Sequence, residues 1–386
     1  MAKRGASLRG RIAIVGIAEL AEPAGARSPA GMMADAARLA IADAGVRKDQ
    51  IDGLFATTPY YYAPTLTFAE YFGLAPRYTD SSVLGGCSFE AYVGHAAAAI
   101  ETGLCDYALI TYGSTQRSDG RALVSGSEWL EYERPYGMMH PISPIAMIAA
   151  RHMHQYGSTS EQFAHAAVAA REWSRLNPRA PYRDRPLTID DVLSSPLIST
   201  PVHKLDCCLV TDGAAALVIT SAERARELPT VPAFVLGFGE ASDHRNITGM
   251  TDLTVTRAVD SAQRAFEMSG LTPQDVDVAE VYDAFTMSLA VLLEDIGFCA
   301  KGDGGALLES GATRPGGSLP LNTNGGGLSF VHPGMLGAFL LTEAVQQLRG
   351  DAGARQVTGA RTAVAHGMGF TLGGHATVVL GAAETL

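Results

Sequence analysis

One short pattern occurs twice in this chain, once in each half. Residues 44–52 (AGVRKDQID) and residues 269–277 (SGLTPQDVD) share a small residue, a Gly, an apolar residue and a closing Asp in the same order. Each copy follows an Ala-rich amphipathic helix and precedes an apolar, strand-like run. Apolar runs at residues 214–220 and 376–380 then close each half. We therefore expect a tandem duplication of one α/β unit.

The order of strand-like and helix-like runs indicates the fold class, α/β. In the first half they alternate, which is typical of βα units and of a largely parallel, buried sheet. These runs are 12–18, 33–44, 53–57, 89–101 and 106–112. Residues 117–201 are rich in Arg, Tyr, Pro, His and Met, and we expect an insertion that covers the sheet, with helices near 143–156 and 160–176. The two halves are placed at residues 1–230, including the insertion, and 231–386.

The composition excludes several classes of function. Of the 386 residues 47% are hydrophobic and 18% charged, which indicates a large core and not a disordered chain. The net charge of −11 disfavours nucleic acid, and no apolar run reaches the ~18 residues that cross a bilayer. The five cysteines form no CxxC pair and the histidines no HExxH motif, so we expect no metal site. An odd number of cysteines in a chain of this size favours reduced thiols and a cytoplasmic location.

Four blocks of sequence resemble one enzyme family, in the family's own order. They are residues 85–89 (GGCSF), 280–285 (EVYDAF), 322–329 (NTNGGGLS) with 332–334 (HPG), and 373–376 (GGHA). Together they resemble the thiolase superfamily, most closely the sterol-carrier-protein-type thiolases and lipid-transfer proteins, a branch that includes steroid side-chain aldol lyases. The resemblance implies the thiolase fold: duplicated halves in a five-layer αβαβα arrangement, with an inserted loop domain. It also implies a homodimer.

The thiolase cysteines are the point where this chain departs from the family. A thiolase uses a Cys at a helix N-terminus as its nucleophile, because that position lowers the pKa of the thiol. Counting back from Gly103, the family's nucleophile position falls on Gly86, and Cys87 is one residue further on. One residue turns a helical side chain by roughly 100°, so Cys87 is a nucleophile only if an insertion restores the register. The other interpretation is a small buried Cys at a tight helix start.

The second thiolase cysteine is also missing. In the family block it is replaced by Ala284, and the C-terminal alternative is absent from residues 365–369 (AHGMG). His366 lies in that region and is interpreted either as an acid or base, or as a hydrogen-bonded structural histidine. A thiolase reaction of the usual kind is therefore doubtful.

The residues that stabilise an enolate are retained. His332 matches the family His that hydrogen-bonds the thioester oxygen, and Tyr282 stands where thiolases have an Asn or His. A phenol there can donate to an oxyanion or take the proton of a β-hydroxyl group. Asp283 is expected to order the loop of Tyr282, with a direct proton role left open. Residues expected to lie against coenzyme A in the glycine loop are Gly326, Gly327 and Ser329.

This set of residues suits a retro-aldol cleavage of a β-hydroxyacyl-CoA. Removing the hydroxyl proton breaks the Cα–Cβ bond and leaves an acyl-CoA enolate, which needs oxyanion donors but no covalent nucleophile. The alternatives are an acyl-CoA acyltransferase that uses Cys87 and a non-catalytic lipid-transfer or scaffold subunit. The resemblance implies coenzyme A as part of the substrate and no tightly bound cofactor. It leaves open a small partner subunit of OB-fold and zinc-ribbon type.

Overall fold

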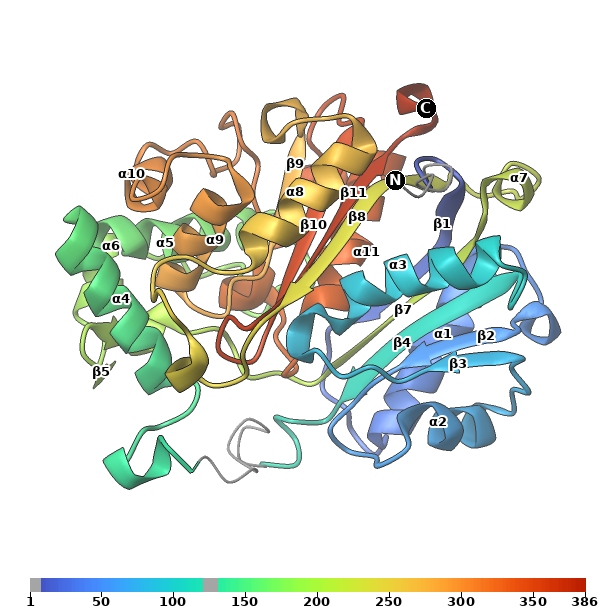
Figure 1. The fold of residues 1–386 in the computed structure, drawn as a ribbon, viewed down its shortest axis with the longest axis horizontal. Coiled ribbons are helices and arrows are strands. Elements are labelled where there is room, and N and C mark those ends of the chain that lie inside the picture. Colours follow the sequence, from blue (N-terminus) through green and yellow to red (C-terminus); the bar gives the residue numbers. More distant parts are fainter. Residues whose placement is uncertain (1–7, 121–130) are drawn as a thin grey trace, which may run out of the picture.

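The computed structural model describes residues 8–120 and 131–386, so part of the expected insertion, residues 121–130, lies outside the described residues. Its strands are β1 (Ile12–Leu20), β2 (Gly53–Ala56), β3 (Tyr78–Asp80), β4 (Tyr107–Ser114), β5 (Leu197–Ser199), β6 (Val202–His203), β7 (Gly213–Ser221), β8 (Ala233–Ser242), β9 (Val278–Val281), β10 (Thr362–Gly369) and β11 (Gly374–Gly381). All except β5 and β6 form one nine-stranded sheet in the order β3-β2-β4-β7-β1-β8-β11-β10-β9 (Figure 1). Strands of the first half thus lie on one side of the sheet and strands of the second half on the other.

The sheet is mixed, so the expectation of a largely parallel sheet is wrong. Strand β2 pairs parallel with β3 and β4, and β9 pairs parallel with β10. The pairings β4–β7, β7–β1, β1–β8, β8–β11 and β11–β10 are antiparallel. Connectivity explains the β10–β11 pairing, because β11 follows β10 through the tight turn 370–373, and such a turn joins only antiparallel strands.

Four long helices surround the sheet: α1 (Pro29–Asp43), α3 (Ser88–Glu101), α8 (Ala258–Ser269) and α11 (Gly337–Arg349). Helix α1 contacts β1, β4 and β7, and α8 contacts β8 and β11, which it crosses in Figure 1. Helices α3 and α11 contact each other and strands of both halves. The start of α3, where the family has its nucleophile, is therefore buried at the junction of the two halves.

The two copies of the repeated pattern fold alike. Helices α1 and α8 are each followed by a glycine in the left-handed conformation, Gly45 (φ 68°) and Gly270 (φ 71°), and then by a 3-10 turn and a strand. The Asp52 carboxylate accepts two backbone N–H groups at the start of β4, at 2.8 and 2.9 Å. The Asp277 carboxylate accepts two at the start of β10, at 2.8 and 3.0 Å. The duplication read from the sequence is confirmed, and the boundary between the halves near residue 230 stays a prediction.

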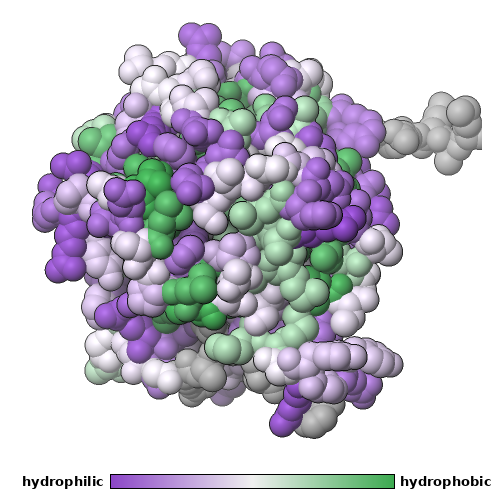
Figure 2. All heavy atoms as spheres, turned by 90° about the vertical axis from the view of Figure 1, so that its left-hand side faces the viewer, coloured by the Kyte–Doolittle hydropathy of each residue, from purple (hydrophilic) through white to green (hydrophobic). Residues whose placement is uncertain are grey.

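The insertion contains the two helices that the sequence predicts. They are α4 (Ile142–Tyr156) and α5 (Ser160–Arg175). Both pack on α9 (Thr286–Ile296), where the ring of buried His152 lies 2.9 Å from the carboxylate of Glu294. Figure 2 looks onto this side of the molecule, where green apolar side chains interrupt the polar surface; exposed apolar residues of the insertion include Met147, Leu197 and Ile198.

The remaining helices are short. They are α2 (Pro64–Phe72), α6 (Ile189–Leu193), α7 (Ala222–Ala225) and α10 (Gly304–Glu309). Within residues 8–120 and 131–386, no helix has both the length and the apolar character that a membrane span requires.

Candidate active site

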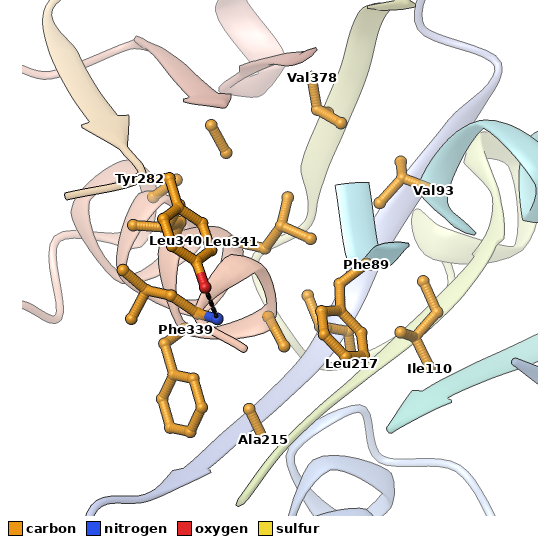
Figure 3. Close-up of a cluster of buried hydrophobic side chains, with 14 of the residues drawn as sticks. Phe89, Val93, Ile110, Ala215, Leu217, Tyr282, Phe339, Leu340, Leu341 and Val378 are labelled. Carbon is orange, nitrogen blue, oxygen red and sulfur yellow. Dashed lines mark hydrogen bonds between the residues drawn. The ribbon is translucent and has the colours of Figure 1, made fainter. Parts of the chain in front are cut away.

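Tyr282 and His332 meet in the structure, although they come from separate loops. Tyr282 directly follows β9, and His332 follows the glycine-rich segment. The Tyr282 Oη lies 3.1 Å from the His332 Nε2, and the two rings are nearly perpendicular, with centroids 5.6 Å apart. The Leu336 N–H, just before α11, donates to the same Oη over 3.2 Å (Figure 3). The geometry therefore joins the two residues that the sequence singled out; their catalytic roles stay a prediction.

Burial sets the protonation of this pair. It lowers the pKa of His332 to about 4 and raises the pKa of Tyr282 well above its usual value. At neutral pH the imidazole is therefore neutral and the phenol keeps its proton, so the Tyr282 O–H donates to Nε2. Because Oη also accepts the Leu336 N–H, the hydroxyl is held on both sides. Such a pair can take a proton from a substrate hydroxyl at Oη while passing its own to the imidazole.

The Tyr282 ring fills the space that a side chain at Gly86 would need. A Cβ built on Gly86 would lie 2.3 Å from Cε2 and 2.6 Å from Cζ of Tyr282, and 2.6 Å from the carbonyl oxygen of Met368. Real Cβ atoms essentially never approach another atom within 3.0 Å. A cysteine at the family's nucleophile position and a tyrosine in this ring position therefore exclude each other.

Cys87 is not placed as a nucleophile. Its side chain is fully buried, and its Sγ donates to the carbonyl oxygen of Leu84 at 3.1 Å. Burial, and secondarily the carboxyl group of Glu90, raises the pKa of the thiol well above 9. A thiolate is the reactive form of cysteine, so a raised pKa disfavours Cys87 as a nucleophile at neutral pH. The structure thus favours the second interpretation of Cys87, a packing residue at a tight helix start.

Asp283 orders the glycine-rich segment that leads to His332. Its carboxylate accepts the N–H groups of Gly327 at 2.7 Å and Leu328 at 3.2 Å. A Cβ on Gly326 would lie 2.2 Å from Oδ2 of Asp283, so the glycine makes room for this carboxylate. Burial raises the pKa of Asp283 to about 7. Asp283 was expected to order the loop of Tyr282, but these hydrogen bonds go to the loop before His332.

The residues expected to lie against coenzyme A have internal partners instead. Gly326 and Gly327 are buried around the Asp283 carboxylate, and the Ser329 hydroxyl accepts the Nε–H of Arg171 at 3.1 Å. The glycines are thus explained by the fold of their own loop. This geometry does not support a contact of Gly326, Gly327 or Ser329 with coenzyme A, which stays a prediction.

His366 belongs to a buried chain of hydrogen bonds with His375 and Thr377. The His375 Nε2–H donates to the Leu372 carbonyl at 2.8 Å, which leaves its Nδ1 to accept from the His366 Nε2 at 3.3 Å. The His366 Nδ1 then accepts from the Thr377 hydroxyl at 2.8 Å. Burial, reinforced by His375, lowers the pKa of His366 well below 6.5. Both ring nitrogens are engaged, which favours the structural interpretation of His366.

Sequence reasoning missed the segment 207–211, which joins the two site loops. The Cys208 N–H donates to the carbonyl of Ala284 at 2.8 Å, and the Thr211 N–H to that of His332 at 3.3 Å. The His332 N–H in turn donates to the Thr211 hydroxyl at 3.1 Å. Backbone groups make most of these bonds, so no motif in the sequence signals them.

Glu90 is a second residue that the sequence did not single out. It lies one helical turn after Gly86, is 1% exposed, and neither carboxyl oxygen has a hydrogen-bond partner among the described residues. Two glycines make room for it, because a Cβ on Gly337 or Gly367 would lie 2.2 or 2.4 Å from its Oε2. Burial raises the pKa of Glu90 to about 8, so at neutral pH the group is mostly uncharged.

We expect Glu90→Gln to stabilise the protein, increasingly so as the pH rises. Above about pH 4.5 the carboxyl ionises in the unfolded chain, whereas the folded protein keeps it protonated up to about pH 8. The unfolded state therefore binds fewer protons than the folded state in this pH range. The unfolding free energy of the wild type falls by about 1.4 kcal/mol per pH unit there, whereas that of the Glu90→Gln variant does not. Urea unfolding from about pH 5 to about pH 9 measures the difference, which should level off above pH 8. Glu70→Gln, at an exposed position, serves as control. If the difference in unfolding free energy between Glu90→Gln and the wild type did not depend on pH, Glu90 would not be buried as an uncharged acid.

The sequence and the fold of this chain have known counterparts. Residues 239–382 match the family model described as "Thiolase C-terminal domain-like". A steroid side-chain-cleaving aldolase of Thermomonospora curvata is 34% identical over 364 residues, covering 88% of this chain and 90% of that protein. The chain belongs to the thiolase superfamily, in its sterol-carrier-protein-like branch.

Other members of the thiolase superfamily resemble this one over nearly its whole length. An acetyl-CoA acetyltransferase of Methanothermobacter thermautotrophicus is 35% identical, covering 90% of this chain and 92% of its own. The solved structure of the Ltp2-ChsH2(DUF35) aldolase superposes with a TM-score of 0.88 at 31% identity, covering 97% of this chain and 98% of that one. This thiolase-like chain therefore has relatives named for carbon–carbon cleavage and for acyl transfer.

Proposed function

We propose that this chain cleaves the Cα–Cβ bond of a β-hydroxyacyl-CoA by a retro-aldol reaction. The observation that carries the proposal is the Tyr282 ring in the space beside Gly86. It leaves no room for a cysteine at residue 86, and it brings a phenol that is hydrogen-bonded to His332 next to the start of α3. The similarity to two aldolases supports the same reaction. The similarity to an acetyltransferase fits the alternative of acyl transfer, which the burial of Cys87 disfavours.

The hydrogen-bonded pair of Tyr282 and His332 accounts for each proton transfer of this reaction. The β-hydroxyl group gives its proton to Oη of Tyr282 as the phenol proton moves to Nε2 of His332. The oxygen electrons form the new carbonyl, and the electron pair of the Cα–Cβ bond moves onto the thioester as an enolate. Because burial lowers the pKa of His332 to about 4, its imidazolium returns the proton readily, and Cα receives it. The products are a ketone or aldehyde and a shortened acyl-CoA, and Tyr282 and His332 regain their starting state.

We expect Cys87→Ala to leave this cleavage unchanged, since the thiol is buried and takes no part in it. The assay offers β-hydroxyacyl-CoA to the purified protein and measures the carbonyl product and the acyl-CoA by chromatography. A parallel assay offers acetoacetyl-CoA with coenzyme A and measures acetyl-CoA. Cys105→Ala, another buried cysteine, controls for lost packing. Formation of acetyl-CoA that disappears in Cys87→Ala but not in Cys105→Ala would replace the lyase by a thiolase.

We also propose an oligomeric state, a partner subunit and a cellular location for the enzyme. Coenzyme A enters as part of the substrate, and no tightly bound cofactor is required by the steps above. A homodimer is proposed because β3 is an edge strand of the sheet that residues 8–120 and 131–386 form, and a second copy can pair with such an edge. A small partner subunit is proposed because the aldolase at TM-score 0.88 is named as an Ltp2-ChsH2(DUF35) assembly. All five cysteines are free, which suits the cytoplasm.

Light scattering on the purified chain tests the homodimer. We expect a mass about twice that of the 40.5 kDa chain. Charged substitution at the edge, such as Thr79→Lys in β3, should shift the mass to that of one chain. A monomeric wild type would refute the homodimer.

A further inference from the structure

A loop, and not a further strand, covers the edge of the sheet next to Tyr282. Strand β9, which ends at Val281, is the last strand in the order of the sheet that residues 8–120 and 131–386 form. Beyond it lies a single parallel bridge between Ala279 and Leu321, where the Asn322 N–H donates to the Ala279 carbonyl at 2.9 Å. An edge strand leaves every second residue without a partner strand, and its buried N–H and C=O groups need other partners.

The side-chain amide of Asn322 supplies those partners at Val281. Its Oδ1 accepts the Val281 N–H at 2.7 Å, and its Nδ2 donates to the Val281 carbonyl oxygen at 2.8 Å. An amide carries both an acceptor and a donor, as a peptide group does, so one side chain satisfies both groups. Val281 directly precedes Tyr282, whose own N–H donates to the His366 carbonyl in β10 at 3.0 Å. The backbone that carries the phenol is therefore held from both sides.

The backbone of Asn322 adopts a conformation that few residues favour. Its φ is 51°, in the left-handed region, where Asn is among the most frequent residues other than glycine. Glycine fits this conformation without strain but has no amide. Asp shares the tolerance of Asn, but an ionised Asp only accepts hydrogen bonds and would face the Val281 carbonyl with a negative charge. Position 322 thus combines a backbone suited to Asn with two hydrogen bonds that require its amide.

The next residue anchors this loop to the helix that also reaches the phenol. The Thr323 hydroxyl donates to Oε1 of buried Glu343, in α11, at 2.6 Å. The N–H of Leu336, just before the same helix, donates to Oη of Tyr282. The loop of Asn322, the start of α11 and the end of β9 are therefore tied together around the phenol.

We infer that Asn322 is a positioning residue of this enzyme: its amide fixes the residue before Tyr282 and so keeps the phenol in hydrogen-bonding contact with His332. Its effect on the rate rests on the proposed lyase function. Proton transfer requires the two groups within hydrogen-bonding reach, and a displacement of about 1 Å can cost 100-fold in rate. Asn322 is 2% exposed and acts only through the backbone of Val281.

Two substitutions separate the amide of Asn322 from its backbone conformation. Asn322→Gly keeps the left-handed conformation and removes both hydrogen bonds, so we expect kcat for a β-hydroxyacyl-CoA to fall about 10- to 100-fold with KM unchanged. Asn322→Asp reproduces the amide only in its protonated form, whose O–H donates to the Val281 carbonyl. Its kcat should match the wild type at low pH and fall to the value of Asn322→Gly as the carboxyl ionises. Steady-state kinetics from about pH 5 to about pH 9 cover this change, because burial raises the pKa of an acid.

Asn177→Asp is the matched control. Asn177 is also fully buried, and its amide also bridges two backbone groups, since it accepts the Arg179 N–H at 3.1 Å and donates to the Asn324 carbonyl at 2.9 Å. Neither group adjoins Tyr282 in the chain. We expect this variant to lose stability as the pH rises and to keep the kcat of the wild type at every pH. A parallel fall of kcat in both Asp variants would mean that any buried charge loosens the protein, and would overturn the inference.

The position of the phenol also has a readout that needs no cleavage. Burial lowers the pKa of His332 to about 4, so its ring is mostly neutral at about pH 5 in the wild type. If Asn322→Gly displaces the phenol, the imidazole loses the hydrogen bond of Tyr282 to Nε2 and its pKa rises toward the usual value of 6.5. NMR of isotope-labelled histidine between about pH 5 and about pH 8 measures this shift.

The outcomes separate this inference from the proposed function. A wild type that cleaves no β-hydroxyacyl-CoA refutes the lyase, and the NMR titration then decides the inference alone. An unchanged pKa of His332 in Asn322→Gly overturns the inference whatever the rate does. A kcat of Asn322→Gly equal to that of the wild type also overturns it, and the lyase stands.

Discussion

Replacing Tyr282 with Phe is expected to lower kcat for retro-aldol cleavage by about 100-fold or more, with the fold intact. The substitution removes one oxygen atom, which takes the substrate proton in the proposed mechanism and contacts the His332 Nε2 at 3.1 Å. General acid–base groups contribute typically 10²–10⁴-fold to a rate, so the loss falls in kcat rather than in KM. The phenyl ring still fills the space beside Gly86. Steady-state kinetics with a β-hydroxyacyl-CoA and thermal unfolding of the same samples measure both effects.

The matched control for this substitution is Tyr92→Phe. Tyr92 is also buried, and its hydroxyl donates to a single carbonyl oxygen, that of Ser82, at 2.7 Å. Its loss should lower stability by about 1 kcal/mol and leave kcat unchanged. A Tyr282→Phe enzyme that works as fast as the Tyr92→Phe enzyme would remove the phenol from the mechanism. The hydrogen bond to His332 would then be a structural contact.

The sequence predicted Tyr282 and His332 as partners because both belong to sequence blocks that resemble the thiolase family. Counting residues from Gly103 also placed Gly86, and not Cys87, at the nucleophile position. What occupies the space at Gly86 could not be predicted, because the Tyr282 ring arrives there from the other half of the chain. Contacts between distant segments depend on how α3, β9 and β10 pack together, and periodicity along one segment carries no such information.

Residue type alone also led to one wrong expectation and to one that the geometry does not support. Alternating strand-like and helix-like runs suggested a parallel sheet, but hydrophobic patterns record burial and not strand direction. The glycines at 326 and 327 suggested a ligand, since glycine permits a close approach. The group that approaches these glycines is the carboxylate of Asp283, the residue directly after Tyr282. A glycine therefore shows that something comes close, and only the fold shows what it is.

Gly86→Ala is expected to destabilise the protein by about 1–3 kcal/mol and to lower kcat by about 100-fold. The new methyl group would lie 2.3 Å from the Tyr282 ring on one side and 2.6 Å from the carbonyl of Met368 on the other. Overpacking of this kind displaces side chains, and a shift of about 1 Å at the reacting groups can cost 100-fold in rate. Urea unfolding and steady-state kinetics measure the two effects. Gly103→Ala, after the other end of α3, has no atom within 4 Å of the Cβ position, but its φ of 74° strains an alanine. It is therefore the control for activity, which it should keep although it too loses stability.

A double-mutant cycle isolates the clash from any other effect of the methyl group. Tyr282→Ala removes the ring that collides with the methyl group of the Gly86→Ala variant. The double variant should therefore be more stable than the sum of the two single losses predicts, by about 1 kcal/mol or more. Additive losses would mean that the ring and a side chain at residue 86 do not compete for space. The Tyr282 ring would then not be the reason that residue 86 lacks a side chain. Losses smaller than additive would instead explain why a cysteine at residue 86 and a tyrosine at residue 282 exclude each other. The space at the start of α3 holds either the nucleophile or the phenol ring, but not both.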